Sequence, residues 1–116
     1  MQRSSATNME SPHLLVVVLY VNEGQEAAFA HFEAIAADIM RSHGGRIARA
    51  VRCAEVSSGA RAPYEIHLVE FPSEEAFLGY RRDSRLAAHS GLRAQAICKT
   101  EIWTGWDVDP PALAVE

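Results

Sequence analysis

The sequence predicts an α+β domain in which the elements follow the order strand, helix, strand, strand, helix, strand. Two observations predict this order: four segments of strand length are rich in apolar residues, and two longer segments are typical of helices. The 116 residues are 48% hydrophobic and 22% charged, which is typical of one globular domain and excludes disordered and fibrous chains.

The first strand and the first helix carry the strongest patterns. Residues 14–21 are apolar, rich in valine and too short for a typical helix, so we expect a strand there, followed by a turn at residues 22–24. Glycine adopts the left-handed cap conformation easily, so Gly44 and Gly45 end the helix that we expect over residues 25–42. The apolar stripe of this helix consists of Ala28, Phe32, Ile35 and Ile39.

Three further strands are expected in the rest of the chain. Residues 46–56 alternate in part between polar and apolar side chains, and residues 64–71 form a stronger strand pattern. The segment between them, residues 57–63, is rich in turn-forming residues and is expected to be a loop. The last strand is expected over residues 96–103.

The second helix is expected to begin after Ser73 and to be broken. A serine at the N-cap and acidic residues in the first turn favour a helix start at this point. A break is expected near Asp83, which is suited to cap a new segment that runs to His89 and ends at Gly91.

This order of elements predicts a ferredoxin-like βαββαβ sandwich. With right-handed crossovers the strands form an antiparallel sheet of order 4-1-3-2, and both helices cover the same face. We expect a flexible N-terminal tail over residues 1–12, the folded domain over residues 13–106, and a C-terminal tail over residues 107–116.

The first strand also predicts a partner chain. Two helices cover only one face of a four-stranded sheet, so a strand exposed on its other face should alternate apolar and polar residues. Here both faces are apolar, one formed by Leu14, Val16, Val18 and Tyr20 and the other by Leu15, Val17, Leu19 and Val21. A second copy of the same sheet is the simplest cover, so we expect a homodimer joined through its sheet faces.

Side-chain alternation suggests what such an interface contains. If the more apolar residues of each strand face the helices, then the other set faces the partner sheet, and it consists of Glu65, His67, Lys99 and Glu101. These charged groups are suited to hold a polar ligand. They are equally suited to form ion pairs between subunits.

Several functional classes are excluded by composition and by missing motifs. A net charge of −4 disfavours nucleic-acid binding, and the longest apolar run is far shorter than the ~20 residues of a membrane-spanning helix. No secretory signal is visible, so we expect a cytoplasmic protein. The chain has no nucleophile elbow, phosphate-binding loop or paired-cysteine motif.

The histidines and cysteines narrow the choice of candidate functional residues further. The five histidines have none of the spacings of metal ligands, so no metal site is predicted. His67 is the best candidate for chemistry, since it lies in the middle of a central strand where its ring is shielded, although a purely structural role stays open. Cys53 and Cys98 fall on opposite edge strands, too far apart for a disulfide, and are expected to be free thiols.

Three short motifs give the sequence a family resemblance. They are His-Gly-Gly-Arg at residues 43–46, Val-Glu-Phe-Pro-Ser at residues 69–73, and the stretch from Tyr80 to Arg93, which has an aspartate at its centre. With these motifs the sequence resembles the dimeric α/β-barrel superfamily over residues 13–106. It is most similar there to an uncharacterised bacterial group related to antibiotic-biosynthesis-type monooxygenases and muconolactone isomerases.

The resemblance implies two ferredoxin-like chains joined through their sheets, with a cleft between helices and sheet that accepts a small apolar or aromatic ligand. We therefore expect a homodimer that binds a small organic molecule, as a cofactor-independent monooxygenase or isomerase. The alternatives are a non-catalytic small-ligand sensor and a structural dimer. The expected catalytic residues are His67, Arg93 and Tyr80, and the expected ligand-binding residues are Tyr20, Glu65, Glu70 and Trp103. No cofactor is expected.

Overall fold

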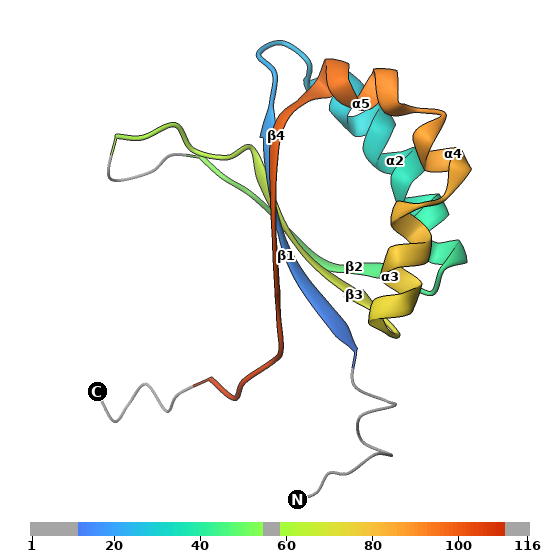
Figure 1. The fold of residues 1–116 in the computed structure, drawn as a ribbon. Helices are drawn as coiled ribbons and strands as arrows, with labels where there is room; N and C mark the ends of the chain where they lie inside the picture. The colour runs from blue at the N-terminus through green and yellow to red at the C-terminus, as the bar shows by residue number, and fades with distance from the viewer. Residues whose placement is uncertain (1–11, 55–58, 111–116) are drawn as a thin grey trace, which may run out of the picture.

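The computed structural model describes residues 12–54 and 59–110, which form a four-stranded antiparallel sheet with helices packed on one of its faces (Figure 1). The strand order is β2-β3-β1-β4, which is the predicted order read from the other edge. The elements are β1 (His13–Val21), α2 (Glu26–Ser42), β2 (Arg46–Arg52), β3 (Glu65–Phe71), α3 (Glu74–Arg81), α4 (Ser84–Ala87), α5 (Ser90–Ala96) and β4 (Ile97–Gly105). The ferredoxin-like α+β fold is therefore confirmed.

Most of the predicted boundaries agree with the structure. The Ser73 hydroxyl accepts a hydrogen bond from the backbone N–H of Ala76 at 3.0 Å and so caps α3, and Asp83 caps α4 in the same way. Gly44 has a φ of +79°, the left-handed conformation expected after α2. The predicted N-terminal tail lies outside the described residues except for Pro12. Also outside them are residues 111–116 of the predicted C-terminal tail, residues 55–56 of the predicted second strand and residues 57–58 of the predicted loop.

One helix was missed. Gly91 was expected to end the segment that follows Asp83, but it lies inside α5, a further helix that precedes β4. Its N-cap, His89, makes no capping hydrogen bond through its side chain, so the sequence carries no local start signal. Burial explains the helix instead, because Ala96 is completely buried and Leu92 packs against the same apolar cluster.

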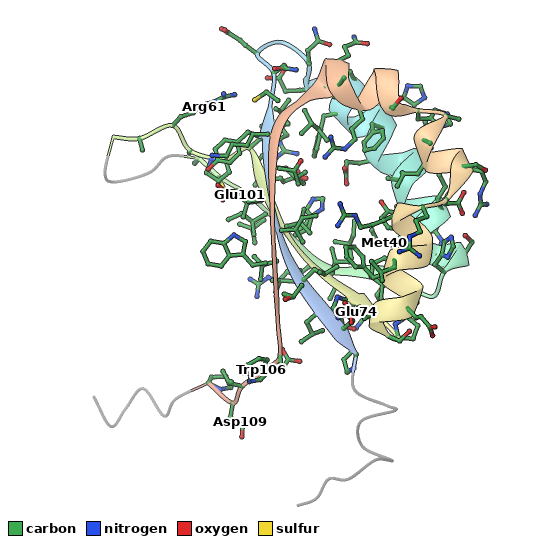
Figure 2. The ribbon with its side chains drawn as sticks, in the orientation of Figure 1. Met40, Arg61, Glu74, Glu101, Trp106 and Asp109 are labelled. Atoms are coloured by element: carbon green, nitrogen blue, oxygen red, sulfur yellow. The ribbon has the colours of Figure 1, made fainter. Side chains whose placement is uncertain are left out.

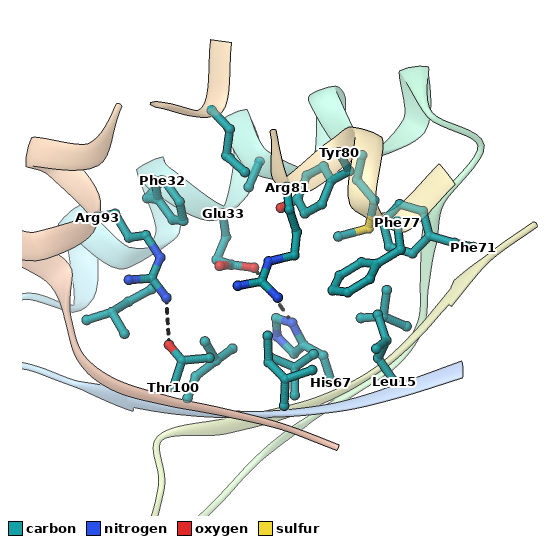
Figure 3. Close-up of a pocket in the computed structure, with 18 residues that line it drawn as sticks. Leu15, Phe32, Glu33, His67, Phe71, Phe77, Tyr80, Arg81, Arg93 and Thr100 are labelled. Carbon is teal, nitrogen blue, oxygen red and sulfur yellow. Dashed lines mark hydrogen bonds and ion pairs between the residues drawn. The ribbon is translucent and has the colours of Figure 1, made fainter. Parts of the chain in front are cut away.

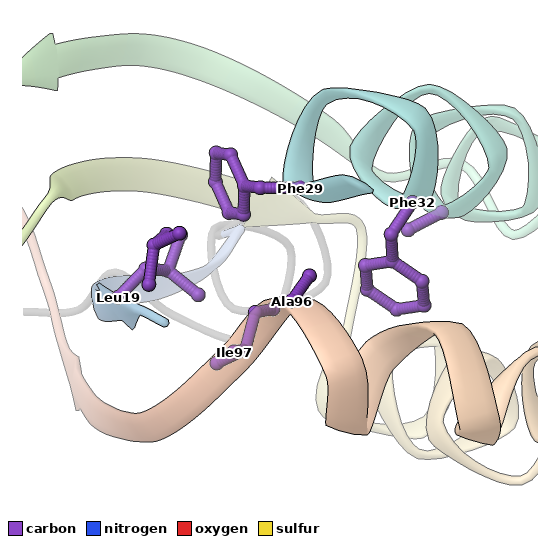
Figure 4. Close-up of a cluster of buried hydrophobic side chains, with 7 residues drawn as sticks. Leu19, Phe29, Phe32, Ala96 and Ile97 are labelled. Atoms are coloured by element: carbon purple, nitrogen blue, oxygen red, sulfur yellow. The ribbon is translucent and has the colours of Figure 1, made fainter. Parts of the chain in front are cut away.

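The core fills the space between the helices and the sheet and has two parts. The first joins α2, α5 and one end of β1 through Leu19, Val21, Phe29, Phe32, Ala36, Ala96 and Ile97 (Figure 4). The second joins α2, α3 and β3 through Leu15, Met40, Val69, Phe71 and Phe77. Val17 packs against both parts, so the middle of β1 lies where they meet.

The opposite face of the sheet, called here the open face, carries no helix in the part of the chain that the structure describes. Figure 2 shows Met40 on the helix side of the sheet and Glu101 on the open side. The pairing register places Val16 beside Leu68 and Trp103, and their side chains are 38%, 44% and 66% exposed. A large apolar surface is therefore uncovered in the single chain.

The predicted side-chain orientation is wrong for β3 and agrees with the structure for β4. Glu65 and His67 do not lie on the open face but beside Val69 on the face toward the helices. The alternation of side chains could not identify the buried face of β3, because apolar residues lie on both of its faces. Lys99 and Glu101 do lie on the open face, where they pair with Tyr20 and Val18 of β1.

Candidate functional site

The site is a cavity of about 350 Å³ between the helix layer and the sheet (Figure 3). Its volume and its mostly apolar walls are typical of a pocket for a small organic molecule. Leu15, Val17, Phe32, Met40 and Phe77 contribute to these walls. The polar residues of the lining are Glu33, His67, Tyr80, Arg81, Arg93 and Thr100.

His67 is fixed in this cavity by a carboxylate behind it. Its side chain points from β3 toward the helices and is only 5% exposed. Nε2 lies 2.8 Å from Oε1 of Glu65, which follows from the strand geometry, because residues two apart point to the same face. An ionised carboxylate is only an acceptor, so Nε2 carries the hydrogen and neutral His67 has a free lone pair on Nδ1.

The Nδ1 atom of His67 faces a second carboxylate. Oε1 of Glu33, on helix α2, lies 3.7 Å from Nδ1. His67 therefore lies between two carboxylates, Glu65 on the sheet and Glu33 on the helix. Figure 3 shows the Glu33 carboxylate reaching from the helix layer toward the sheet, where His67 lies.

The two carboxylates have opposite pKa shifts. Burial raises the pKa of Glu33 and outweighs the attraction of His67. Burial also acts to raise the pKa of Glu65, but hydrogen bonds from His67 and Arg52 reverse this, so its pKa is lowered. The Arg52 contact is close, with Nη2 2.6 Å from Oε2 of Glu65. Glu65 thus stays ionised while Glu33 holds a proton more easily, an arrangement typical of acid–base sites.

Tyr80 and Arg93 complete the polar lining. Burial, with a smaller contribution from the charge of Glu33, raises the pKa of Tyr80 to about 12, so its hydroxyl remains a hydrogen-bond donor at neutral pH. Arg93 is held by a 2.8 Å hydrogen bond from Nη2 to the Thr100 hydroxyl. The cavity therefore offers a base in His67, a neutral donor in Tyr80 and positive charge from Arg81 and Arg93.

The structure brings the three expected catalytic residues, His67, Tyr80 and Arg93, into one cavity. Of the expected ligand-binding residues, Glu65 lies behind His67, while Tyr20, Glu70 and Trp103 do not line the cavity. The side chains of these three residues point away from the helices, as the register of β1, β3 and β4 shows. Tyr20 lies beside Lys99, Glu70 is hydrogen-bonded to Arg46, and Trp103 is exposed.

Sequence reasoning missed Glu33, Arg81 and Thr100. A signal for Glu33 was present: it lies one helical turn after Phe29 and one before Ala36, inside the stripe of α2 that is buried. A single acidic residue in a buried apolar stripe is costly unless it serves a purpose. The predicted apolar stripe, which included Ala28, Phe32 and Ile35, lies at a different angle around the helix axis, so Glu33 fell outside it.

Metal ligation has no support in the described residues, 12–54 and 59–110, where no group of three or more His, Cys, Asp or Glu side chains is suited to a metal ion. Cys53 and Cys98 are free, as predicted. No helix in this part of the chain is both long and apolar enough to span a bilayer.

Comparison with known proteins shows the fold. No protein-family model matches the chain, and no curated protein matches it either. Among solved structures, a protein of unknown function from Rhodopseudomonas palustris superposes with a TM-score of 0.75 at 15% identity, over 87% of this chain and 85% of that one. SnoaB, a cofactor-independent oxygenase from Streptomyces nogalater, superposes with a TM-score of 0.63 at 16% identity, over 88% of this chain and 98% of that one.

A nipsnap family protein of unknown function from Agrobacterium tumefaciens gives a TM-score of 0.61 at 17% identity, over 83% of this chain and 87% of that one. Similarity at these identities extends to the arrangement of helices and strands. It does not extend to the site, because one fold hosts many unrelated activities. Function must therefore be argued from the residues of the cavity.

Proposed function

We propose that this protein binds a small organic molecule in the cavity and removes a proton from one of its carbon atoms, with His67 as the base. The observation that carries the proposal is the buried arrangement of Glu65, His67 and Glu33 at one wall of an apolar pocket. A histidine oriented by one carboxylate, with its free nitrogen toward a pocket, is the geometry that general base catalysis requires.

Each polar residue then has a role. Glu65 holds the ring of His67 and stabilises the imidazolium that forms when Nδ1 takes the proton. The electron pair left on carbon moves onto a neighbouring carbonyl oxygen, where the Tyr80 hydroxyl donates a hydrogen bond and Arg93 supplies positive charge. Glu33, whose pKa is raised by burial, is a second group that holds and returns a proton.

The carbanion has two fates, and both agree with the families that the sequence resembles. Return of the proton to a different carbon gives an isomerase, as in muconolactone isomerases. Reaction with dioxygen followed by loss of water gives a carbonyl product, which is a cofactor-independent monooxygenation. The structural similarity to SnoaB supports the second fate at the level of fold alone.

Deuterium exchange tests the proton-transfer step without a known substrate. We expect the wild-type protein to accelerate exchange of the acidic C–H protons of 2-tetralone in D2O above the buffer rate, measured by proton NMR. His67→Ala should return the rate to that of buffer. The matched control is His31→Ala, since His31 is exposed on α2 and does not line the cavity. Exchange that is no faster than in buffer, or unchanged in His67→Ala, contradicts the proposal.

We also propose that two chains join through their open faces. The support is the exposed apolar surface formed by Val16, Val51, Leu68 and Trp103, which a second copy would bury. Sedimentation equilibrium should give twice the 12.7 kDa chain mass at micromolar concentration. Leu68→Glu should dissociate the dimer, while Ala34→Glu, at an exposed position of α2, should not. A monomeric wild-type protein contradicts this assignment.

A further inference from the structure

Two arginines from separate helices line the cavity, and neither forms an ion pair with a carboxylate of the described residues. Arg81 is the last residue of α3, and Arg93 lies in α5. Figure 3 shows both guanidinium groups reaching from the helices into the cavity toward the sheet. Within residues 12–54 and 59–110, the side chain of Arg93 is hydrogen-bonded only to the neutral Thr100 hydroxyl, and the guanidinium carbon of Arg81 lies 5.6 Å from the centroid of the Phe77 ring.

The acidic residues near the cavity do not neutralise this charge. The carboxylate of Glu65 is occupied by hydrogen bonds from Arg52 and His67. Glu33 lies within ion-pair distance of His67, and burial favours its neutral form by raising its pKa. Two guanidinium charges therefore face a mostly apolar cavity, in which Glu33 is the acidic residue of the lining and its charged form is disfavoured by burial.

We propose that the ligand of this cavity is an organic anion, a carboxylate carried on a small apolar or aromatic ring, and that Arg81 and Arg93 bind the carboxylate. The planar guanidinium fork matches a carboxylate in geometry and charge. The aliphatic and aromatic walls would hold the ring. This inference rests on the proposal that the cavity binds a small organic molecule, and it adds the chemical class of that molecule and the role of Arg81.

The hydrogen bond from Arg93 to Thr100 supports this assignment. It fixes the side chain at the cavity without cancelling its charge, since a hydroxyl is neutral. Arg81 has a second role available, because its guanidinium carbon lies over the ring of Phe77 in a cation–π contact. The test must therefore separate the charge of Arg81 from its packing.

A matched pair of probes makes this separation. Naphthalene-2-carboxylate and naphthalene-2-carboxamide have almost the same shape, but only the first is charged, and NMR titration of the 15N-labelled protein measures both dissociation constants. We expect the carboxylate to bind about tenfold more tightly than the amide, because hydrogen bonds to charged groups are the stronger ones. Arg81→Gln and Arg93→Gln should each bring this ratio severalfold closer to one.

The control is Arg82→Gln, since Arg82 is the exposed neighbour of Arg81 and does not line the cavity. It should leave the ratio unchanged. Arg81→Lys keeps the charge and most of the stem, so it should retain part of the preference. A ratio near one in the wild-type protein, or the wild-type ratio in Arg81→Gln, overturns the inference.

The two proposals fail in different ways. The exchange probe, 2-tetralone, is neutral, so its binding does not require a charge–charge contact with the two arginines. His67→Ala should lose exchange and keep the preference for the carboxylate. Exchange that depends on His67, together with equal binding of carboxylate and amide, refutes the anion inference alone. A tenfold preference without any exchange refutes proton transfer alone.

Discussion

Two histidine–carboxylate pairs in this molecule have the same separation and different surroundings. Nε2 of His67 lies 2.8 Å from Glu65, and Nε2 of His43 lies 2.8 Å from Asp83. The first pair lies at the wall of a cavity, and its second ring nitrogen faces Glu33. The second pair joins the end of α2 to the turn between α3 and α4, and its histidine is 25% exposed.

The difference lies in what else each carboxylate does. Asp83 accepts hydrogen bonds from the backbone N–H and the guanidinium group of Arg85, so it caps α4 and fastens it to α2. Its contacts are those of a structural residue: it caps α4 through the backbone N–H of Arg85 and joins α4 to the end of α2 through His43. Glu65 caps no helix, and it holds a buried imidazole whose other nitrogen faces a pocket. A contact of the same length is therefore structural in one place and suited to chemistry in the other.

The largest effect that separates the pairs is expected from Glu65→Gln. An amide in this position no longer stabilises the imidazolium and allows the other tautomer of His67, so we expect exchange of 2-tetralone to slow about a hundredfold. Thermal unfolding at pH 7 should also occur at a lower temperature, because the amide lacks the charge that Arg52 and His67 stabilise through their hydrogen bonds. The exchange rate, rather than the stability, therefore separates the two pairs. Equal exchange rates in Glu65→Gln and the wild type would show that the two pairs do not differ in function.

Asp83→Asn should also lower stability, but it should leave exchange unchanged. Hydrogen bonds from Arg85 and His43 hold the pKa of Asp83 well below its usual range. Because the folded pKa is lowered, the stabilisation is present above the unfolded value near ~3.9 and is lost gradually as the pH falls from that value toward the much lower folded pKa. Thermal melts from pH 7 to pH 3 should therefore show a gap between wild type and variant that is constant near neutral pH and narrows below about pH 4. A gap independent of pH contradicts the assignment.

Glu33→Gln tests whether burying the carboxylate of Glu33 in the cavity lowers the stability of the protein. Burial raises the pKa of Glu33, so the folded state holds its proton more tightly than the unfolded state, and stability falls as the pH rises from the unfolded value to the folded one. The neutral amide removes this cost, so we expect a higher Tm than wild type at pH 7 and the same Tm at pH 4. A variant less stable at pH 7 would mean that the Glu33–His67 contact outweighs burial.

The fold could be predicted because its signals are local. The apolar run of β1, the Ser73 cap and the Gly44 turn each depend on a few adjacent residues, and all three are confirmed. Helix α5 could not be predicted in this way. It has a glycine at its second position and no side-chain cap, and it forms because Ala96 is buried against α2 and β1.

The site was predicted in part, because its residues come together through register rather than through spacing. His67, Tyr80 and Arg93 were expected from the resemblance and from the central position of β3, and they do meet in one cavity. The face on which His67 lies was predicted wrongly, since β3 is apolar on both sides. Glu33 and Arg81 reach the cavity because of where they lie around the axes of α2 and α3. An error in the predicted buried face of a helix therefore hides such a residue.

The smallest expected effect is that of His43→Ala on stability. This change removes one hydrogen bond to Asp83 but leaves the helix cap and the Arg85 contacts in place, so we expect a loss of about 1 kcal/mol in the free energy of unfolding, typical of one hydrogen bond. Urea unfolding at pH 7 measures it, and His13→Ala is unsuitable as a control because that ring packs on Phe77. The exposed His31 provides the control instead. A loss as large as that of Asp83→Asn would mean that His43, rather than the cap, holds the joint between α2 and α4 together.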